Sequence, residues 1–534
     1  MCTVIGVLVV YPMALAMWTA VRGAGSPGNP GSWPVHPTLS MVLQTILWPI
    51  SIALGSVVLA WPVAWKLGRT ARPWRPWLAV PLTMPTYLAY SGYGIVRSPG
   101  TWFGDWLQTV GREQWSDAPF VVGQMLAWLG LVLWSWPIAA GILIGGVRAV
   151  DPSIDDALSM DGRAGFHRLW MHIRLVRGTL VCTLAILSLL MLGSAIPLHL
   201  AQVEAWSLKL WLALDNVPRE GRWRVFVLAT PLLAAAALAG WWISGWAIRG
   251  AVQEDHIGVH ARTGVGRGGI AATVWMCIAW TASSCVPLAL FAGSIREARS
   301  LIEFWRINAD AVGWSALIAV LTGLLCTLVT LAVWILVSSR SRPGLLRVVL
   351  TILVACGLSP GVIVGAIVNE AWNQWPWQQS IADTLWVVVL AHGARFAWIG
   401  GLVGLVLAGL EPRERREQRA LDGDDSLWGW WLTSARPALG ALVGSGVAVG
   451  LLSLHEIEST VMVQPPGIDG LSRRILQFLH FSSMEDLFAA GVWLVGGGLV
   501  LSVLAAWASR NQWRSGLLPD SGVELNKPSS KSVG

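Results

Sequence analysis

Charged residues are scarce in this sequence: Asp, Glu, Lys and Arg make up 13% of its 534 residues, against 54% hydrophobic residues. A soluble globular domain carries roughly 25% charged residues. The shortage of charge therefore excludes an ordinary soluble protein. Apolar stretches of about 20 residues, the length of a membrane-spanning helix, recur along almost the whole chain and leave no room for a large soluble domain.

Motifs of catalysis and cofactor binding are also missing. No phosphate-binding loop of the Gly-x-x-x-x-Gly-Lys-Ser/Thr type occurs, so the chain does not bind ATP by that route. There is no HExxH sequence and no CxxC pair, and the six cysteines all lie in apolar stretches, where we expect small core residues. His256 and His260 have an i, i+4 spacing but no third ligand nearby, so we interpret them as a chance pair. We expect no enzyme active site, no metal site and no bound cofactor.

The apolar stretches predict an all-α polytopic membrane protein with about twelve spans. Their expected ranges are 2–20, 41–66, 75–97, 119–147, 178–197, 223–248, 269–293, 313–338, 344–368, 383–409, 437–456 and 486–508. Basic residues in the loops after the second, sixth and eighth spans place these loops in the cytoplasm by the positive-inside rule. Both termini are then cytoplasmic. The net charge of +7 is explained by these loops, and we expect no nucleic-acid partner.

The two halves of the chain carry Arg-Pro pairs and single prolines at matching positions. Arg72-Pro73 follows the second span and Arg342-Pro343 follows the eighth, and Pro85 and Pro360 interrupt the third and ninth spans. This pattern predicts two parallel six-span repeats about an axis along the membrane normal. The expected domains are a first permease lobe over 1–255, a cytoplasmic linker over 256–268, a second lobe over 269–510 and a disordered cytoplasmic tail over 511–534.

Two polar segments, each after the fourth span of its half, end in Asp-Gly. One runs from Asp155 to Gly162 and the other from Glu417 to Gly423, and the two glycines are about half the chain apart. An amphipathic helix is expected over 166–175 after the first segment. A helix-glycine-helix elbow of this kind fits a groove on a cytosolic partner. The alternative is an amphipathic loop that rests on lipid headgroups.

These segments resemble the EAA motif of permease subunits of ABC importers, in which Glu-Ala-Ala precedes a glycine. Asp156-Ala157-Leu158 with Gly162 takes these positions in the first half, and Glu417-Gln418-Arg419 with Gly423 takes them in the second. The first copy has Asp for Glu, and the second keeps only Glu and Gly. The resemblance implies that Asp156, Ala157, Gly162, Glu417 and Gly423 contact two cytoplasmic ABC ATPase subunits, which hydrolyse the ATP.

A further run, from Ser453 through Pro465-Pro466-Gly467 to His480, is similar to fused two-lobed iron(III)-type permeases, whose relatives carry thiamine. This resemblance covers nearly the full chain and implies a type I ABC importer permease in a bacterial cytoplasmic (inner) membrane. An external binding protein would deliver a small solute, iron(III) as the first guess and thiamine or similar as the second. It would dock near 463–485 and around 198–222.

Four residues are candidates for the translocation pathway: Pro85, Tyr87, Pro360 and Glu456. Proline breaks line central pathways in transporters, although a packing kink is the alternative. Glu456 lies at the end of the eleventh expected span, where a carboxylate faces a partner or an aqueous path. The alternative is that its carboxylate forms a structural hydrogen bond. Glu458, two residues on, is expected to be solvated. The alternative function is an ion-gradient-driven secondary transporter, for which Glu456 is the one good candidate residue.

Overall fold

The computed structural model describes residues 6–24, 37–68, 75–151, 153–154, 157, 160, 166–218, 221–253, 270–297, 299–338, 343–411, 417, 419, 421, 426–480 and 484–514. Every regular element within these residues is helical, which confirms the all-α prediction for this part of the chain.

The helices of the first half, in chain order, are η1 (Gly6–Val10), α2 (Tyr11–Ala24), α3 (Leu39–Gly68), η3 (Arg75–Thr83), α4 (Thr86–Gly94), η4 (Ile95–Arg97), α5 (Trp102–Glu113), α6 (Ala118–Arg148), α8 (Phe166–Leu175), α9 (Arg177–Leu192), α10 (Ala195–Leu200), α11 (Trp206–Asn216) and α12 (Arg222–Gln253). Those of the second half are α13 (Ile270–Trp280), η6 (Thr281–Cys285), α14 (Val286–Ser294), α15 (Arg299–Ser338), α16 (Pro343–Leu358), α17 (Gly361–Trp372), α18 (Pro376–Ala382), α19 (Leu385–Leu410), α21 (Leu427–Trp430), η7 (Trp431–Ala435), α22 (Leu439–Leu454), α23 (Glu458–Val463), α24 (Leu471–His480) and α25 (Met484–Arg514).

Several of these helices are long and apolar enough to cross a membrane. Within the described residues, six helical stretches qualify by themselves, and nine qualify if each of three bent helix pairs counts as one span. The bends are 76° between α8 and α9, 112° between α16 and α17, and 84° between the α21–η7 stretch and α22. A chain with this many apolar helices is embedded in a membrane.

The two halves pack their helices in the same pattern. In the first half α3 packs on α6 and α9, and α4 packs on α6; in the second half α15 packs on α19 and α22, and α17 packs on α19. The short helices α10 and α23 then contact α4 and α17, respectively. The halves therefore have equivalent helices: α3 and α15, α4 and α17, α6 and α19, α9 and α22, α10 and α23.

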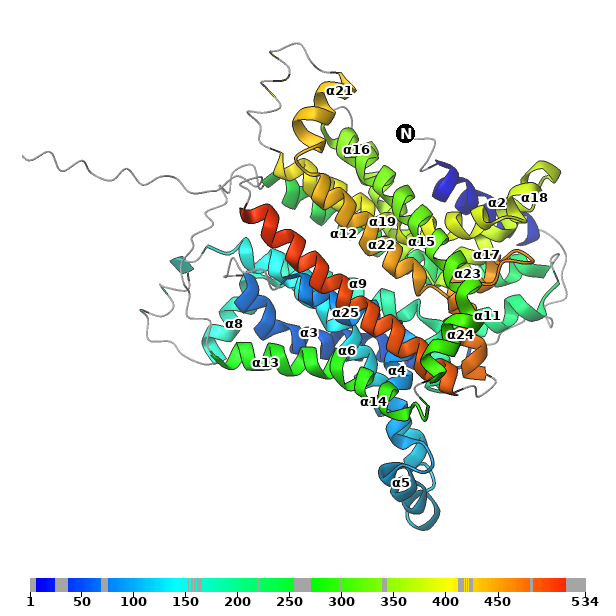
Figure 1. Ribbon diagram of the computed structural model, residues 1–534. Coiled ribbons are helices and arrows are strands. Elements are labelled where there is room, and N and C mark those ends of the chain that lie inside the picture. The colour runs from blue at the N-terminus through cyan, green and yellow to red at the C-terminus, as the bar shows by residue number, and fades with distance from the viewer. Residues whose placement is uncertain are drawn as a thin grey trace, which may run out of the picture.

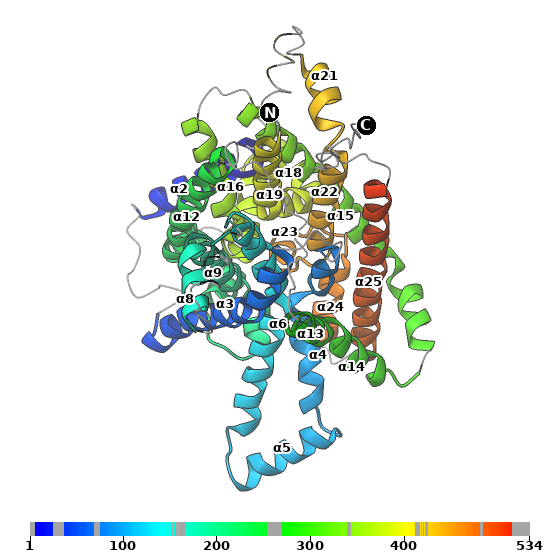
Figure 2. The ribbon, with the colours of Figure 1, turned by 90° about the vertical axis from the view of Figure 1, so that its left-hand side faces the viewer.

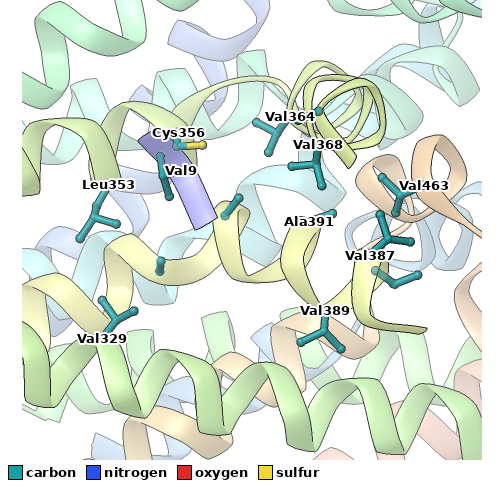
Figure 3. Close-up of a cluster of buried hydrophobic side chains, with 14 of the residues drawn as sticks. Val9, Val329, Leu353, Cys356, Val364, Val368, Val387, Val389, Ala391 and Val463 are labelled. Carbon is teal, nitrogen blue, oxygen red and sulfur yellow. The ribbon is translucent and has the colours of Figure 1, made fainter. Parts of the chain in front are cut away.

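The first and last long helices of each half pack against the other half. Helices α2 and α12 lie on α17 and α16, while α14 and α25 lie on α4 and η3. Figure 1 shows the result as two groups, with α2 and α12 among the yellow helices and the red α25 beside the blue ones. Figure 3 shows Val9, from the start of the chain, in a buried cluster with Leu353, Val364 and Val387 of the second half.

Equivalent hydrogen bonds in the two groups join these helices to the half against which they pack. The hydroxyl of Tyr11 donates to the carbonyl of Ala371 (3.1 Å), from α2 to α17. In the other group the hydroxyl of Tyr93 in α4 donates to the carbonyl of Ala282 in η6. Each bond joins the first helix region of one half to the third helix region of the other, so the exchange follows the same two-fold pattern as the packing.

Exposed tryptophans mark the connections between the third and fourth helix regions of each half. Helix α5 projects from the body on the arms of α4 and α6 (Figure 2), and its Trp102 and Trp106 are exposed. In the second half Trp375 and Trp377 are exposed at the start of α18. Indole rings favour membrane–water interfaces, and the exposure of tryptophans at both of these connections is consistent with that preference.

The cysteines only partly follow the core prediction. Cys182, Cys326 and Cys356 are buried and Cys285 is half-buried, but Cys277 is exposed on α13. A core position for Cys277 is therefore wrong. Most of α13 is exposed, because this helix contacts the body mainly along α3 and η6. Cys2 lies outside the described residues.

Candidate functional site

Both candidate prolines lie at helix breaks. Pro85 precedes α4 and Pro360 precedes α17, and both have extended backbone angles, with φ −57° and ψ 145° for Pro85 and φ −54° and ψ 129° for Pro360. A proline has no N–H to continue a helix, and its preceding residue is pushed out of the helical conformation. Both side chains are buried. The breaks therefore leave backbone carbonyls inside the protein that need hydrogen-bond donors.

Arg395 supplies the donors at the second break. From the buried middle of α19 its guanidinium donates to the carbonyl of Gly357 (3.1 Å) and to that of Ser359. These carbonyls belong to the last residues before the 112° bend. The Arg395 side chain thus replaces the interrupted helical hydrogen bonds between α16 and α17.

Two carboxylates lie beside this break. The carboxylate of Glu456 accepts from the backbone N–H and the hydroxyl of Ser459, both at 3.0 Å. Glu458 is only 8% exposed, so the expectation that it is solvated is wrong. It begins α23 and turns inward, where its Oε2 has no hydrogen-bond partner among the described residues.

Gly361 allows the two carboxylates to approach. A Cβ atom added to this glycine would stand 2.8 Å from Glu456 Oε1 and 2.8 Å from Glu458 Oε2. Both oxygens therefore converge on the first turn of α17. Any larger residue at this position would push at least one carboxylate away, since contacts this short are repulsive.

The same cluster contacts the first half of the chain. Glu458 Oε1 accepts from the N–H of Ile196 (3.4 Å), at the start of α10. A Cβ added to Gly193, in the break between α9 and α10, would lie 3.3 Å from the guanidinium of Arg395 and 3.4 Å from Pro360. The breaks of both halves thus meet around Arg395, Glu456 and Glu458, which we call the charged junction.

A polar pocket lies next to the charged junction. The ring of His392 is hydrogen-bonded on both sides, to the hydroxyl of Ser453 (2.6 Å) and to that of Thr460 (2.8 Å). The hydroxyl of Thr460 also donates to the carbonyl of Glu456 (2.6 Å). The pocket is small. Its polar lining comprises Ser315, His392, Ser453, Thr460, Gln464 and Ser472, and Ile318, Val388, Ile468 and Gly470 complete it.

The first half closes its equivalent break without charge. The indole N–H of Trp134, in α6, donates to the carbonyl of Met84 (2.7 Å), directly before Pro85. Tyr87 is buried in the same apolar cluster as Ile196 and Ile457, and its hydroxyl has no hydrogen-bond partner among the described residues. Tyr87 is therefore part of the apolar packing on which the charged junction rests.

The predicted docking residues are described only in part. Asp156, Gly162 and Gly423 lie outside the described residues, while Ala157 and Glu417 are described and exposed. The following helix α8 is amphipathic as expected over 166–175: Trp170 and Leu175 are exposed, and His172 is buried and stacked on Trp65 at 3.7 Å between ring centroids. His256 and His260 also lie outside the described residues.

The residues that sequence reasoning missed are Arg395, His392 and the buried state of Glu458. A usable signal was present for the first two, because ionisable residues inside a predicted span are expensive and mark functional sites. Both lie within the stretch 383–409 expected to be the tenth span. Glu458 has no such signal, since its burial depends on contact with Ile196, 262 positions away.

Comparison of the chain with models of protein families, with curated proteins and with solved structures finds no match. The class that the structure itself defines is an all-α, multi-helix membrane protein whose described residues form two equivalent sets of helices with a buried charged junction between them.

Proposed function

We propose that this chain is the transmembrane permease of an ABC importer, with twelve spans in two parallel six-span lobes. The observation that carries this proposal is the matched exchange of helices between the halves around one central junction. Alternating access requires two similar units that rock about a shared site. The twelve crossings consist of the nine stretches described above together with α2, the η3–α4 pair and α25.

Two cytoplasmic ATPases are proposed to dock at the segments 152–176 and 413–436. The sequence has no phosphate-binding loop, so the ATP would be hydrolysed by these partner subunits. The exposed apolar residues of α8 support docking, because Leu169, Trp170 and Leu175 are 39–49% exposed among the residues that the structure describes. An amphipathic helix of this kind fits a groove in a protein partner.

An external binding protein is proposed to deliver the solute on the opposite side. In Figure 1 helices α11, α18 and α24 all lie on the right-hand side of the molecule, whereas α8 lies at the left and α21 at the top. The docking ranges near 463–485 and around 198–222 include α24 and α11. The proposed location is a bacterial inner membrane with both termini in the cytoplasm. The solute follows from resemblance alone, with iron(III) first and thiamine or a similar small solute second.

The charged junction and the polar pocket beside it are the proposed translocation site. The junction joins α10 of one half to α17, α19 and α23 of the other, so any relative movement of the halves changes its contacts. Glu458 and Arg395 are buried and Glu456 is half-buried, and ionisable side chains within a membrane protein favour the passage or capture of a charged species. Pro85 and Pro360 would act here as fixed bends that expose backbone to the path.

An ion-gradient-driven transporter is the second candidate, and one observation favours it. Glu458 Oε2 is buried close to Glu456 and has no hydrogen-bond partner among the described residues, and two neighbouring carboxylates could share a proton or a monovalent cation as the coupling ion. In this alternative the cytoplasmic segments have no ATPase partner.

Isolation of the tagged chain from its native membrane separates the two candidates. We expect an ATPase subunit to be retained and the complex to hydrolyse ATP. Replacement of both Gly162 and Gly423 by Trp should release the ATPase, because bulky residues break the elbows. Retention of the ATPase and unchanged ATP-dependent uptake in this double variant would contradict the docking proposal. Transport that collapses with a protonophore, without any ATPase, would favour the second candidate.

A further inference from the structure

The second cytoplasmic segment is attached to the helices by a buried ion pair. Arg419, the third residue of the Glu417-Gln418-Arg419 sequence, places its guanidinium 2.8 Å from the carboxylate of Glu411. The two side chains are only 10% and 2% exposed. Surface ion pairs contribute little, but a buried pair strongly resists the removal of either partner, because the other charge is then left uncompensated.

Hydroxyl groups complete the surroundings of this pair. The hydroxyl of Ser434 accepts from Arg419 and donates to Glu411, and that of Thr433 also accepts from Arg419 (3.2 Å). The hydroxyl of Ser338 donates to the other oxygen of Glu411 (3.4 Å). Ser338 ends α15, Glu411 caps the end of α19, and Ser434 lies in η7. We call this group the clasp, since it joins three helix ends to the segment.

The first cytoplasmic segment is held differently. Its equivalent of Glu411 is Ala149, the residue that follows α6, which cannot form an ion pair. In the part of this segment that the structure describes, the contact of helix α8 with α3 is the stacking of His172 on Trp65. A stacked pair of rings is less directional than a charged, multiply hydrogen-bonded pair, so, judged by the described contacts, the second segment is joined to its lobe more stiffly than the first.

Helix α19 connects the clasp with the charged junction. Glu411 follows its last residue, and Arg395 lies 16 positions earlier, which is about 24 Å along a helix at 1.5 Å per residue. At that position Arg395 holds the carbonyls of Gly357 and Ser359 at the break between α16 and α17. A displacement of the clasped segment would therefore move α19 and, through Arg395, the break.

We propose that Arg419 is a coupling residue, which transmits movement of the second docking segment through Glu411 and α19 to the charged junction. This inference rests on the proposed ABC permease function. It adds that the two docking segments differ in their role: the second segment, whose motif is the more degenerate, transmits movement of the ATPase to the helices more directly than the first. Arg419 acts through Glu411 and positions the segment, while the exposed Glu417 remains available to the ATPase.

The test uses the full chain with its ATPase in lipid nanodiscs and the variant Arg419→Met, which keeps an unbranched apolar side chain but removes the guanidinium group and its charge. We expect the ATPase to remain bound, while stimulation of ATP hydrolysis by the solute-loaded binding protein falls by roughly tenfold or more, the size of typical coupling effects. Arg419→Lys should recover part of this stimulation. Arg249→Met is the matched control, because Arg249 is exposed near the end of α12 and lies outside both docking segments, and it should leave stimulation unchanged.

Hydrogen exchange supplies a second measurement that does not depend on the ATPase. Amides of 427–435 should exchange faster in Arg419→Met and not in Arg249→Met, because only the first change releases η7 from the clasp. Faster exchange with intact stimulation would show a merely structural role and overturn the coupling role. Unchanged exchange would overturn the clasp itself. A wild-type chain that binds no ATPase would instead overturn the proposed function, and the coupling role with it.

Discussion

At the break in the first half, the carbonyl before Pro85 accepts from the neutral indole of Trp134; at the equivalent break in the second half, the carbonyl before Pro360 accepts from the charged Arg395. The backbone problem is the same at both places, since a proline leaves carbonyls without helical donors. The indole can serve one carbonyl, whereas the guanidinium serves two and carries a charge that buried carboxylates can balance.

This difference shows how a duplicated scaffold can concentrate chemistry in one copy. Glu456 and Glu458 lie on the charged side, and the position of α10 that corresponds to the start of α23 is Ala195. The first half therefore contributes backbone N–H groups and apolar packing, through Ile196 and Tyr87, and the second half contributes the charges. The predictions that follow test this unequal division.

The largest effect is expected for Arg395→Met. This change leaves the carbonyls of Gly357 and Ser359 without a donor and the two carboxylates without a counter-charge. The free energy of unfolding should fall by about 3 kcal/mol or more, the cost of breaking a buried charged group. Thermal unfolding in detergent measures it, and a loss below about 1 kcal/mol, the size of an ordinary single hydrogen bond, would contradict the role given to Arg395.

The next largest effect is expected for Gly361→Ala, because the added methyl group meets both carboxylates at 2.8 Å. Overpacking of this kind costs about 1–3 kcal/mol. Gly141→Ala in α6 is the control, since a Cβ at that position meets nothing within 4 Å. If both variants unfold at the same temperature, the carboxylates do not converge on Gly361.

A smaller effect is expected for Trp134→Phe. The phenyl ring keeps most of the apolar packing but leaves the carbonyl of Met84 without its donor, at a cost of about 1–2 kcal/mol. The comparison with Arg395→Met decides the argument: the arginine change must be the more damaging one. Equal losses of stability would mean that the two breaks are equivalent despite their different chemistry.

The smallest effect on stability is expected for Glu458→Gln. The amide has nearly the shape of the carboxyl group and can still accept from Ile196, so the free energy of unfolding should change by less than about 1 kcal/mol. Uptake should still be driven by ATP in this variant if the chain is an ABC permease, although its rate should fall because Glu458 belongs to the proposed translocation site. Loss of ion-driven uptake with normal folding would favour the secondary transporter instead.

The sequence was sufficient for the coarse fold and for part of the candidate site. Low charge and repeated apolar stretches predict an all-α membrane protein, and Pro85 and Pro360 lie at helix breaks because proline acts locally. The packing of α2 and α12 on the second half was not predicted, since nothing in a single apolar helix specifies which apolar neighbour it will meet.

Only one residue of the charged junction, Glu456, was predicted from the sequence. Glu456 was selected from its place at the end of a span, whereas the burial of Glu458 depends on the start of α10 in the other half. Arg395 and His392 carried a signal, as charged or polar groups within a predicted span, but their partners could not be named from spacing. The clasp of Glu411 and Arg419 joins residues on both sides of a loop whose folding the motif does not specify.

The most direct test of the account is the number of ATPase subunits bound to one copy of this chain. Native mass spectrometry of the complex, extracted with its lipids from the source membrane, counts them. Two equivalent sets of helices, each with its own docking segment, predict two ATPase subunits on a single chain. A chain that is released alone, or with one ATPase under conditions that preserve the fold, would contradict the proposed two-lobed permease.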